Sequence, residues 1–390
     1  MLIQHFKNPN KNNGRYPEKL KSVLNIKDCN AAYNEIKTWK NYETTPLISL
    51  KKIAKDIGVK KIYYKDESPR FKLGSFKALG GTYGVLKFIY KTLKKEIGNE
   101  VTIRNIKKGF YAKVISKYTV TTATDGNHGR SVAFGAKVFG CKCQIFVHSE
   151  VSIGRQKAME KLNAKVIRIK GNYDKSLKVC KNQAKKNNWY IISDTSYKGY
   201  IEYPRYIMAG YTVMAKEIKN QLANKNLPTH VFLQGGVGSF PASITSYFWQ
   251  EFEANIKNII VETEMAPCLI KSAQNNKMTS FNISEETIMA GLSCGEPSLL
   301  GWEILNQSAD HYLTIDDASI PATMRLLSTN IPKIEAGESS VAGLACLYDL
   351  TKEKGLTKKL DINNESVILI FGTEGATDPE IYKSIIERID

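Results

Sequence analysis

The chain has no apolar run that could cross a membrane or direct secretion. None of its stretches approaches the roughly 18 consecutive apolar residues of a membrane-spanning helix. Its start, from Met1 to Asn12, is polar and lacks the apolar core, about seven to fifteen residues long, of a signal peptide. We therefore expect a cytoplasmic protein without a membrane partner.

Histidine and cysteine are few, and their spacing indicates neither a metal site nor a disulfide framework. Five histidines occur, with no H-x-x-x-H pair and no cysteine at ligand spacing. The seven cysteines are an odd number, and the nearest pair, Cys141 and Cys143, lies in a run that alternates like a strand. We expect no metal and interpret the cysteines as buried thiols.

Acidic residues are outnumbered by basic ones, 38 to 56, which gives a net charge of +18. Such an excess can indicate a polyanionic partner. Here the lysines are dispersed among asparagines and isoleucines, with only short clusters such as Lys51-Lys52 and no basic tail. We interpret the charge as a compositional bias and expect no nucleic-acid partner. A non-catalytic binding protein that uses this charge is the alternative from another class.

Expected strands and helices alternate along the chain. At about 150 residues per domain, 390 residues correspond to two or three domains. The β-α-β-α-β order predicts parallel sheets with helices on both faces, in two doubly wound units. The expected strands are 61–65, 119–123, 143–147, 165–169, 230–233, 259–262 and 367–371, and the expected helices include 75–90, 129–139, 155–162 and 173–185.

Four loops are rich in Gly, Ser, Thr and Asn, and ligands of parallel sheets bind at such loops, beyond the carboxyl ends of strands. They are 124–129, 234–239, 291–297 and 372–379. In the second loop, Gln234-Gly-Gly-Val-Gly-Ser239 follows an apolar run. Its glycines let backbone N–H groups converge at a helix start, as a phosphate requires, although glycines at such a turn also serve close packing. The spacing is that of neither a Walker A loop nor a dinucleotide fingerprint.

Lys77 lies among small and apolar residues, in Ser75-Phe76-Lys77-Ala-Leu-Gly-Gly81. Desolvation lowers the pKa of a lysine and makes its neutral amine a nucleophile toward an aldehyde. Taken alone, it is one surface lysine among many. Together with a phosphate loop, it predicts a Schiff base and a phosphate clip, which is how proteins hold pyridoxal phosphate.

The Asp125-Gly-Asn-His-Gly129 loop follows an expected strand. Asn127 can donate to the ring hydroxyl of such a cofactor. We interpret His128 as a structural residue that packs the loop.

The motifs around Lys77, Asn127 and Gly235, in this order and spacing, resemble those of fold-type II pyridoxal-phosphate enzymes such as threonine dehydratase and the tryptophan synthase β-subunit. With Asp125 and the segments 288–297 and 373–379, the chain from about 42 to 379 is similar to the diaminopropionate ammonia-lyase family. The resemblance implies an α/β fold with two doubly wound domains, the cofactor in the cleft between them, and a homodimer.

In that fold the large domain is discontinuous. The resemblance implies a large pyridoxal-phosphate-binding domain of residues 1–94 plus 226–390. A small α/β domain, 95–225, would carry Asp125, Asn127 and Asp194.

The resemblance also implies a role for each motif residue. Lys77 would hold the cofactor and act as a base, and Asn127 would contact its ring hydroxyl. Thr373 would lie beside the pyridine nitrogen and leave it largely unprotonated. The phosphate would be bound by Gly235, Gly236, Val237, Gly238 and Ser239.

Three carboxylates complete the predicted site. Asp125 would pair with a second substrate ammonium or remove the α-proton of the D enantiomer, although it could instead close the loop as an Asx turn. Asp194 would be a catalytic residue that contacts substrate or cofactor. Glu296 is a weaker candidate, which also fits a turn.

The implied activity is that of a carbon–nitrogen lyase, an ammonia-lyase. It would convert the small amino acid 2,3-diaminopropionate to pyruvate and two ammonia by α,β-elimination. A serine/threonine dehydratase or a β-replacing enzyme of the same fold is the alternative, and it would carry a small residue in place of Asp125. The preferred enantiomer, the physiological role and the oligomeric state stay open.

The chain departs from the family pattern at three places. Ala376 replaces an acidic residue, Gly235 replaces an alanine, and Glu262-Thr263 lacks the usual proline. Cys268 and Cys294 match a cysteine pair of the relatives, so we expect them close in space, either as a redox-sensitive disulfide or as two thiols.

Overall fold

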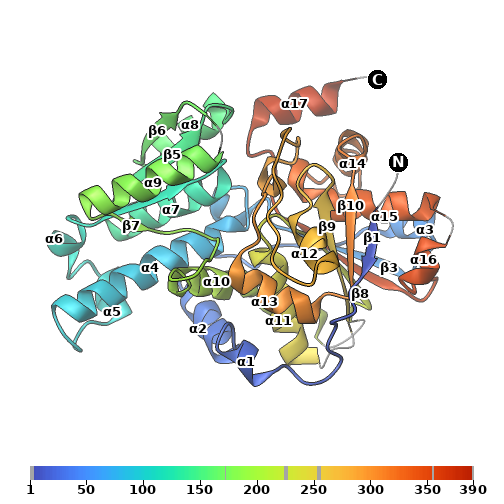
Figure 1. Cartoon of the computed structure of the whole chain (residues 1–390), viewed down its shortest axis with the longest axis horizontal. Helices are drawn as coiled ribbons and strands as arrows, with labels where there is room; N and C mark the ends of the chain where they lie inside the picture. The colour runs from blue at the N-terminus through green and yellow to red at the C-terminus, as the bar shows by residue number, and fades with distance from the viewer. Residues whose placement is uncertain (1–3, 172, 224–226, 253–255, 354, 389–390) are drawn as a thin grey trace. The chain divides into compact units, whose positions relative to one another are not determined.

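The computed structural model describes residues 4–171, 173–223, 227–252, 256–353 and 355–388 (Figure 1). These residues form two compact units. Unit 1 comprises Met1–Phe76 and Tyr211–Asp390, and unit 2 comprises Lys77–Gly210. The chain therefore leaves unit 1 directly before Lys77.

This division differs from the predicted domain bounds of 1–94 plus 226–390 and 95–225, because helix α4 (Lys77–Glu96) packs closely on α7 (Asn127–Phe139). A Cβ on Gly81 would lie 1.7 Å from Ser131 Oγ, and the hydroxyl of Thr82 donates to the carbonyl of Ser131 at 3.0 Å. Only glycine permits this approach, so the whole of α4 belongs to unit 2.

Unit 1 is built on a seven-stranded sheet in the order β1-β10-β9-β8-β11-β3-β2. The five inner strands are parallel, and the short edge strands β1 and β2 run antiparallel to their neighbours. The strands are β1 (His5–Lys7), β2 (Leu47–Ser49), β3 (Lys61–Asp66), β8 (His230–Gln234), β9 (Lys257–Thr263), β10 (His311–Ile315) and β11 (Val367–Gly372). The four strands predicted in this region are confirmed, whereas β1, β2 and β10 were not predicted.

Helices cover this sheet, and one apolar core of unit 1 joins β3, β8, β9, β10 and β11 to α3, α14 and α15. The helices of the unit are α1 (Glu18–Lys21), α2 (Ile26–Ile36), α3 (Lys51–Ile57), η1 (Arg70–Lys72), α11 (Ser239–Phe252), α12 (Cys268–Gln274), η2 (Ala290–Leu292), α13 (Leu299–Ser308), α14 (Ser319–Ser328), η3 (Glu338–Ser340), α15 (Ala342–Lys352), α16 (Leu356–Lys359) and α17 (Pro379–Glu387). Strands buried on both faces read as continuous apolar runs, which is why β8 and β11 were predictable.

Unit 2 holds a four-stranded, fully parallel sheet in the order β6-β5-β4-β7. The strands are β4 (Thr119–Ala123), β5 (Lys142–His148), β6 (Lys165–Ile169) and β7 (Tyr190–Ile191). Besides α4 and α7, the helices are α5 (Ile103–Lys107), α6 (Ala112–Ile115), α8 (Ile153–Glu160) and α9 (Tyr173–Asn187), while α10 (Glu202–Leu222) crosses from unit 2 into unit 1. The predicted α/β class with parallel sheets is confirmed.

The predicted helix 75–90 begins two residues late, at Lys77. Ser75 forms an antiparallel bridge with Glu374, and the N–H of Phe76 donates to the carbonyl of Thr373 at 3.0 Å. Both residues are therefore extended against the loop after β11, and the helix starts only after them.

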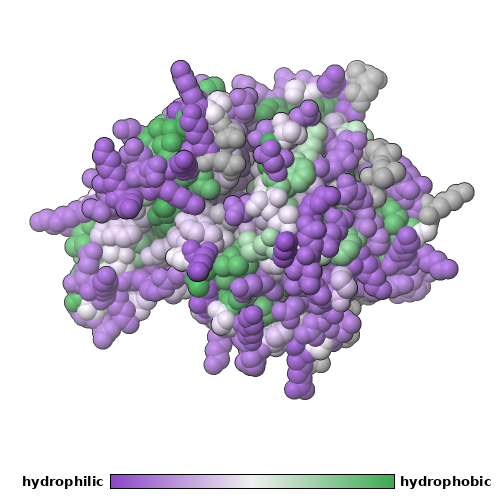
Figure 2. All heavy atoms as spheres, viewed as in Figure 1, coloured by the Kyte–Doolittle hydropathy of each residue, from purple (hydrophilic) through white to green (hydrophobic). Residues whose placement is uncertain are grey.

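The surface gives no sign of a membrane span. In the described part of the chain no helix combines the length and the apolar character that crossing a bilayer requires. Hydrophilic side chains cover most of the face drawn in Figure 2, and apolar ones form small separate patches.

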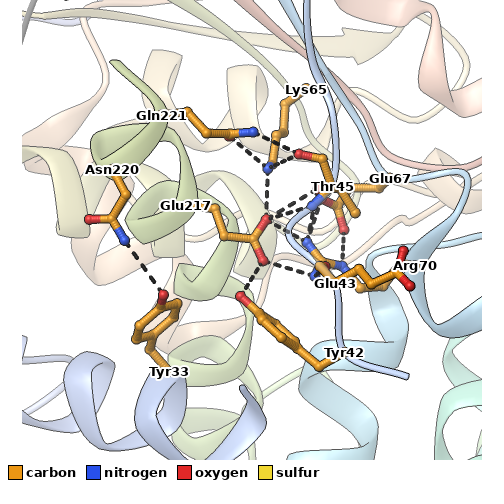
Figure 3. A network of polar contacts seen from close by, with 10 residues as sticks. All are labelled: Tyr33, Tyr42, Glu43, Thr45, Lys65, Glu67, Arg70, Glu217, Asn220 and Gln221. Carbon is orange, nitrogen blue, oxygen red and sulfur yellow. Dashed lines mark hydrogen bonds and ion pairs between the residues drawn. The ribbon is translucent and has the colours of Figure 1, made fainter. Parts of the chain in front are cut away.

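A buried ionic network fixes the segment that precedes Lys77 (Figure 3). Glu217 of α10 accepts hydrogen bonds from Lys65 Nζ at 2.7 Å and from Arg70 Nη2 at 2.8 Å, both on its Oε2. Arg70 also pairs with Glu67, at 2.7 Å from Nε to Oε2, and the hydroxyl of Thr45 donates to Glu67. All four charged side chains are at most 1% exposed. Each charge is compensated, so η1 is held rigidly at the end of β3.

We expect the substitution Glu217→Gln to lower the free energy of unfolding by about 3–5 kcal/mol, because it leaves Lys65 and Arg70 buried with one carboxylate fewer. Urea unfolding followed by circular dichroism measures the change. The control is Glu365→Gln, which breaks the exposed pair with Lys60 and should change stability very little. Equal effects of the two substitutions would show that the network is not stabilised by its charges.

Candidate active site

In unit 2, Lys77 is paired with Asp194. Lys77 is the first residue of α4, Asp194 follows β7, and the lysine Nζ donates to the aspartate Oδ2. The two side chains are 21% and 15% exposed. The amine of Lys77 is therefore mostly buried and has a carboxylate partner, which the sequence did not predict. That partner is Asp194, which was predicted as a catalytic residue that contacts substrate or cofactor.

The carboxylate of Asp194 stays ionised because Lys77 and His128 face it. Burial alone would raise its pKa, but His128, whose Nδ1 lies 3.7 Å from Oδ2, and Lys77 outweigh burial and hold the pKa well below its usual range. His128 is itself buried, and its Nε2 bonds with the carbonyl of Ile192 at 2.8 Å. Burial lowers the pKa of His128. It packs its loop, as the sequence predicted, and connects it to the strand end that carries Asp194.

The loop of Asp125 and Asn127 joins β4 to α7. The hydroxyl of Thr124 accepts from the N–H groups of Gly126 at 3.0 Å and Gly129 at 3.1 Å, and so closes the loop. Thr124 thus does what an Asx turn of Asp125 would have done. The carboxylate of Asp125 is instead directed at His148, with 3.2 Å from its Oδ1 to the histidine Nε2. Asn127 opens α7 and is half-buried.

In unit 1, the glycine turn 234–239 connects β8 to the start of α11. A Cβ on Gly235 would lie 2.7 Å from Leu269 Cδ1, and one on Gly236 would lie 3.0 Å from the carbonyl oxygen of Gly291. Gly238 has φ of +93°, which favours glycine. The glycines therefore serve close packing, the alternative that the sequence had left open, and at Gly235 a Cβ would crowd Leu269. The turn also ends at the N-terminus of a 14-residue helix, whose first N–H groups have no acceptor within the helix and suit a phosphate.

Thr373 lies directly after β11, and Gln234 orients its side chain. The amide Nε2 of Gln234 donates to Thr373 Oγ1 at 2.9 Å and to the carbonyl of Phe371 at 2.9 Å. An amide nitrogen cannot accept, so the hydroxyl proton of Thr373 is directed elsewhere. A hydroxyl held as a donor fits the unprotonated nitrogen of a pyridine ring. Sequence reasoning gave Gln234 no role, although its place at the polar end of an otherwise apolar strand was a usable signal.

The turn is flanked by Cys268 and Cys294. Cys268 Sγ donates to the carbonyl of Gly236 at 3.6 Å, and a Cβ on Gly236 would lie 3.1 Å from Cys294 Sγ. Burial raises the pKa of the Cys268 thiol well above its usual value, with Glu262 and Cys294 adding to the shift. The predicted proximity of the two cysteines is confirmed, and both are free thiols in the structure.

Two other predicted positions have structural roles. Glu262 accepts from the N–H groups of Leu269 and Ile270, each at 2.7 Å, and so caps α12. Burial raises its pKa to about 8. Glu296 is exposed, as the turn interpretation predicts.

Comparison with known proteins decides the family. The family model described as pyridoxal-phosphate dependent enzyme matches residues 38–372. The chain belongs to the pyridoxal-phosphate-dependent enzyme family. The fit of the turn and of Thr373 to a phosphate and a pyridine nitrogen agrees with this membership.

Within this family the chain is similar to diaminopropionate ammonia-lyases. It is 35% identical to that of Salmonella typhimurium over 358 residues, which cover 89% of this chain and 88% of the relative. The crystal structure of diaminopropionate ammonia lyase from Escherichia coli in complex with D-serine matches with a TM-score of 0.90 at 32% identity, covering 99% of this chain and 97% of that one. A probable D-serine dehydratase of Carboxydothermus hydrogenoformans is 30% identical over 69% of this chain and 66% of its own length. The resemblance drawn from the motifs is confirmed.

The described residues form no metal-binding cluster. Among the described residues no group of three or more His, Cys, Asp and Glu side chains is placed to hold a metal ion.

The packing of the turn predicts different effects for two alanine substitutions. Gly236→Ala places a Cβ 3.0 Å from a backbone oxygen that cannot rotate away, so we expect the affinity for pyridoxal phosphate to fall about tenfold or more. In Gly235→Ala the nearest atom is the mobile end of Leu269, so we expect a smaller loss. Titration of the apoenzyme with pyridoxal phosphate measures both. A greater loss for Gly235→Ala would contradict this account of the turn.

Proposed function

We propose that this enzyme removes ammonia from 2,3-diaminopropionate and forms pyruvate and two ammonia. The observation that carries the proposal is Asp125, a carboxylate 26% exposed in the loop that begins α7, two residues before Asn127. A substrate with a second ammonium at Cβ needs such a partner, and a hydroxyl substrate does not. The similarity to the Salmonella and Escherichia enzymes supports the same activity.

The cofactor contacts divide among the motif residues. Lys77 would bind the aldehyde of pyridoxal phosphate, and the turn of Gly235, Gly236, Val237, Gly238 and Ser239 would bind its phosphate. Asn127 would donate to the ring hydroxyl, and Thr373, oriented by Gln234, to the ring nitrogen. Bound in this way, pyridoxal phosphate supplies an electron sink for the charge left when the α-proton is removed.

Two groups would handle the α-proton. The amine of Lys77 would take the proton from one enantiomer, and Asp194 would hold that amine in place. Asp125 takes it from the other enantiomer. A positioned proton acceptor contributes about 10²–10⁴-fold to a rate. A donor at the ring nitrogen, rather than a charged partner, weakens the electron sink and favours prompt loss of the β-amine.

A serine/threonine dehydratase is the second candidate, since a probable D-serine dehydratase is among the relatives. Such an enzyme eliminates water and has no second ammonium to bind, so Asp125 argues against it. The homodimer and the cytoplasmic location stay predictions from the sequence.

We expect Lys77→Ala to abolish the absorbance band at about 410–420 nm that marks a lysine bonded to pyridoxal phosphate, together with all pyruvate formation. Lys91→Ala, which removes a half-exposed lysine from the same helix, is the control and should keep both. An undiminished absorbance band in the Lys77→Ala variant would show that a different lysine holds pyridoxal phosphate.

We expect Asp125→Ser to reduce kcat/KM for diaminopropionate by about 10²-fold or more, because the β-ammonium and the proton lose their carboxylate. Pyruvate formation from D- and L-2,3-diaminopropionate and from D- and L-serine measures it. If activity on diaminopropionate were unchanged while serine were the better substrate of the unmodified enzyme, the dehydratase assignment would replace ours.

A further inference from the structure

Asp125 has a buried partner, His148, to which the function proposed above gives no role. Strands β4 and β5 are parallel neighbours, with Ala123 paired to Phe146. The residues that follow the two strands therefore meet at the same edge of the sheet. There His148 Nε2 lies 3.2 Å from Asp125 Oδ1, and the side chains are 8% and 26% exposed.

The backbone that carries His148 is held by Arg168 of β6. Its Nη1 donates to the carbonyls of His148 at 3.3 Å, Ser149 at 2.8 Å and Val151 at 2.7 Å. Arg168 is itself held by Gln156, whose Oε1 accepts from Nε at 3.2 Å and from Nη2 at 2.9 Å. These hydrogen bonds hold the backbone at the end of β5, which places the imidazole of His148 beside Asp125.

The opposite side of the pair is equally constrained. Thr124 closes the loop of Asp125 through two backbone N–H groups. Arg155 of α8 packs on this loop, with its Cδ 3.1 Å from where a Cβ of Gly126 would lie. The charge of Asp125 also acts on His128 of α7. It raises the pKa of His128, but burial has the larger effect and lowers it. Among these neighbours His148 is the one whose ring nitrogen lies at hydrogen-bonding distance from the carboxylate.

A histidine donor on one carboxylate oxygen determines what the other oxygen can do. When Nε2–H donates to Oδ1, the carboxyl group cannot rotate freely, and Oδ2 becomes the oxygen that faces a reactant. A hydrogen bond to an ionised carboxylate is strong, and a base must be positioned closely to be efficient.

We propose that His148 is the positioning residue of Asp125 and thereby sets the rate with the D enantiomer of the substrate. This inference rests on the proposed function. The α-proton of D-2,3-diaminopropionate passes to Asp125 Oδ2, its electron pair stays on the substrate, and the β-amine leaves as ammonia. His148 donates its hydrogen bond throughout and gains or loses no proton. The L enantiomer, deprotonated by Lys77, does not use the pair.

The test is the ratio of kcat for D- and L-2,3-diaminopropionate in the holoenzyme. With His148→Ala we expect kcat for the D enantiomer to fall about ten- to hundredfold, as for a lost hydrogen bond to a charged group, and kcat for the L enantiomer to stay within about twofold. His148→Gln retains an N–H donor and should recover most of the D activity. His5→Ala, which alters a histidine of unit 1, is the matched control and should change neither rate.

A measurement without substrate tests the contact itself. The chain has five histidines, so ¹⁵N-histidine labelling gives few resonances. We expect Asp125→Ala to shift the Nε2 resonance of His148 and to leave those of His5, His230 and His311, all in unit 1, in place.

The outcomes separate the inference from the proposed function. An equal loss of D and L activity in His148→Ala, no loss of D activity, or an unshifted His148 resonance would each overturn the role of His148. If the unmodified enzyme formed no pyruvate from either enantiomer, the proposed function would fail, and the resonance would still decide whether His148 holds Asp125.

Discussion

The ion pair between Lys77 and Asp194 is the interaction on which the proposed chemistry of this enzyme depends. In the proposed function, the amine of Lys77 would hold the cofactor and act as a base, so it needs a fixed position without a permanent bond. A carboxylate kept ionised by His128 and Lys77 provides that place. The same histidine is bonded to the carbonyl of Ile192, so the loop of Asn127 and the strand end of Asp194 are held together.

Two of the proposed site residues, Thr373 and Asp125, are each held by a second side chain. Gln234 leaves the hydroxyl of Thr373 a donor, and His148 occupies one oxygen of Asp125. The buried charges of Glu217, Lys65 and Arg70 fix the segment that leads into Lys77. Charged groups placed in the interior are costly unless they are fully paired, so such a network is better suited to defining one geometry than to adding stability.

Prediction from sequence succeeded for features that a short continuous segment of the chain encodes. The apolar runs of β8 and β11 identify buried parallel strands, and the glycine-rich turns lie directly after strands, as the sequence predicts. Prediction failed for features that depend on very short segments or on contacts between residues distant along the chain. The edge strands β1 and β2 are three residues long, and the start of α4 depends on a bridge between Ser75 and Glu374, almost 300 residues apart. The boundary of unit 2 likewise depends on how closely α4 and α7 pack.

By itself, the sequence determined the class of cofactor and predicted the residues that would contact it. A lysine, an asparagine-containing loop and a glycine-rich turn are short motifs that can be recognised from their order and spacing along the chain. Only the tertiary structure decided what each of them is paired with. Asp194 lies 117 positions from Lys77, and Gln234 lies 139 from Thr373. Gln234 and Thr373 meet because β8 and β11, distant along the chain, are parallel neighbours that end at one edge of the sheet. Strand order in a sheet follows from packing that no single segment of the sequence records.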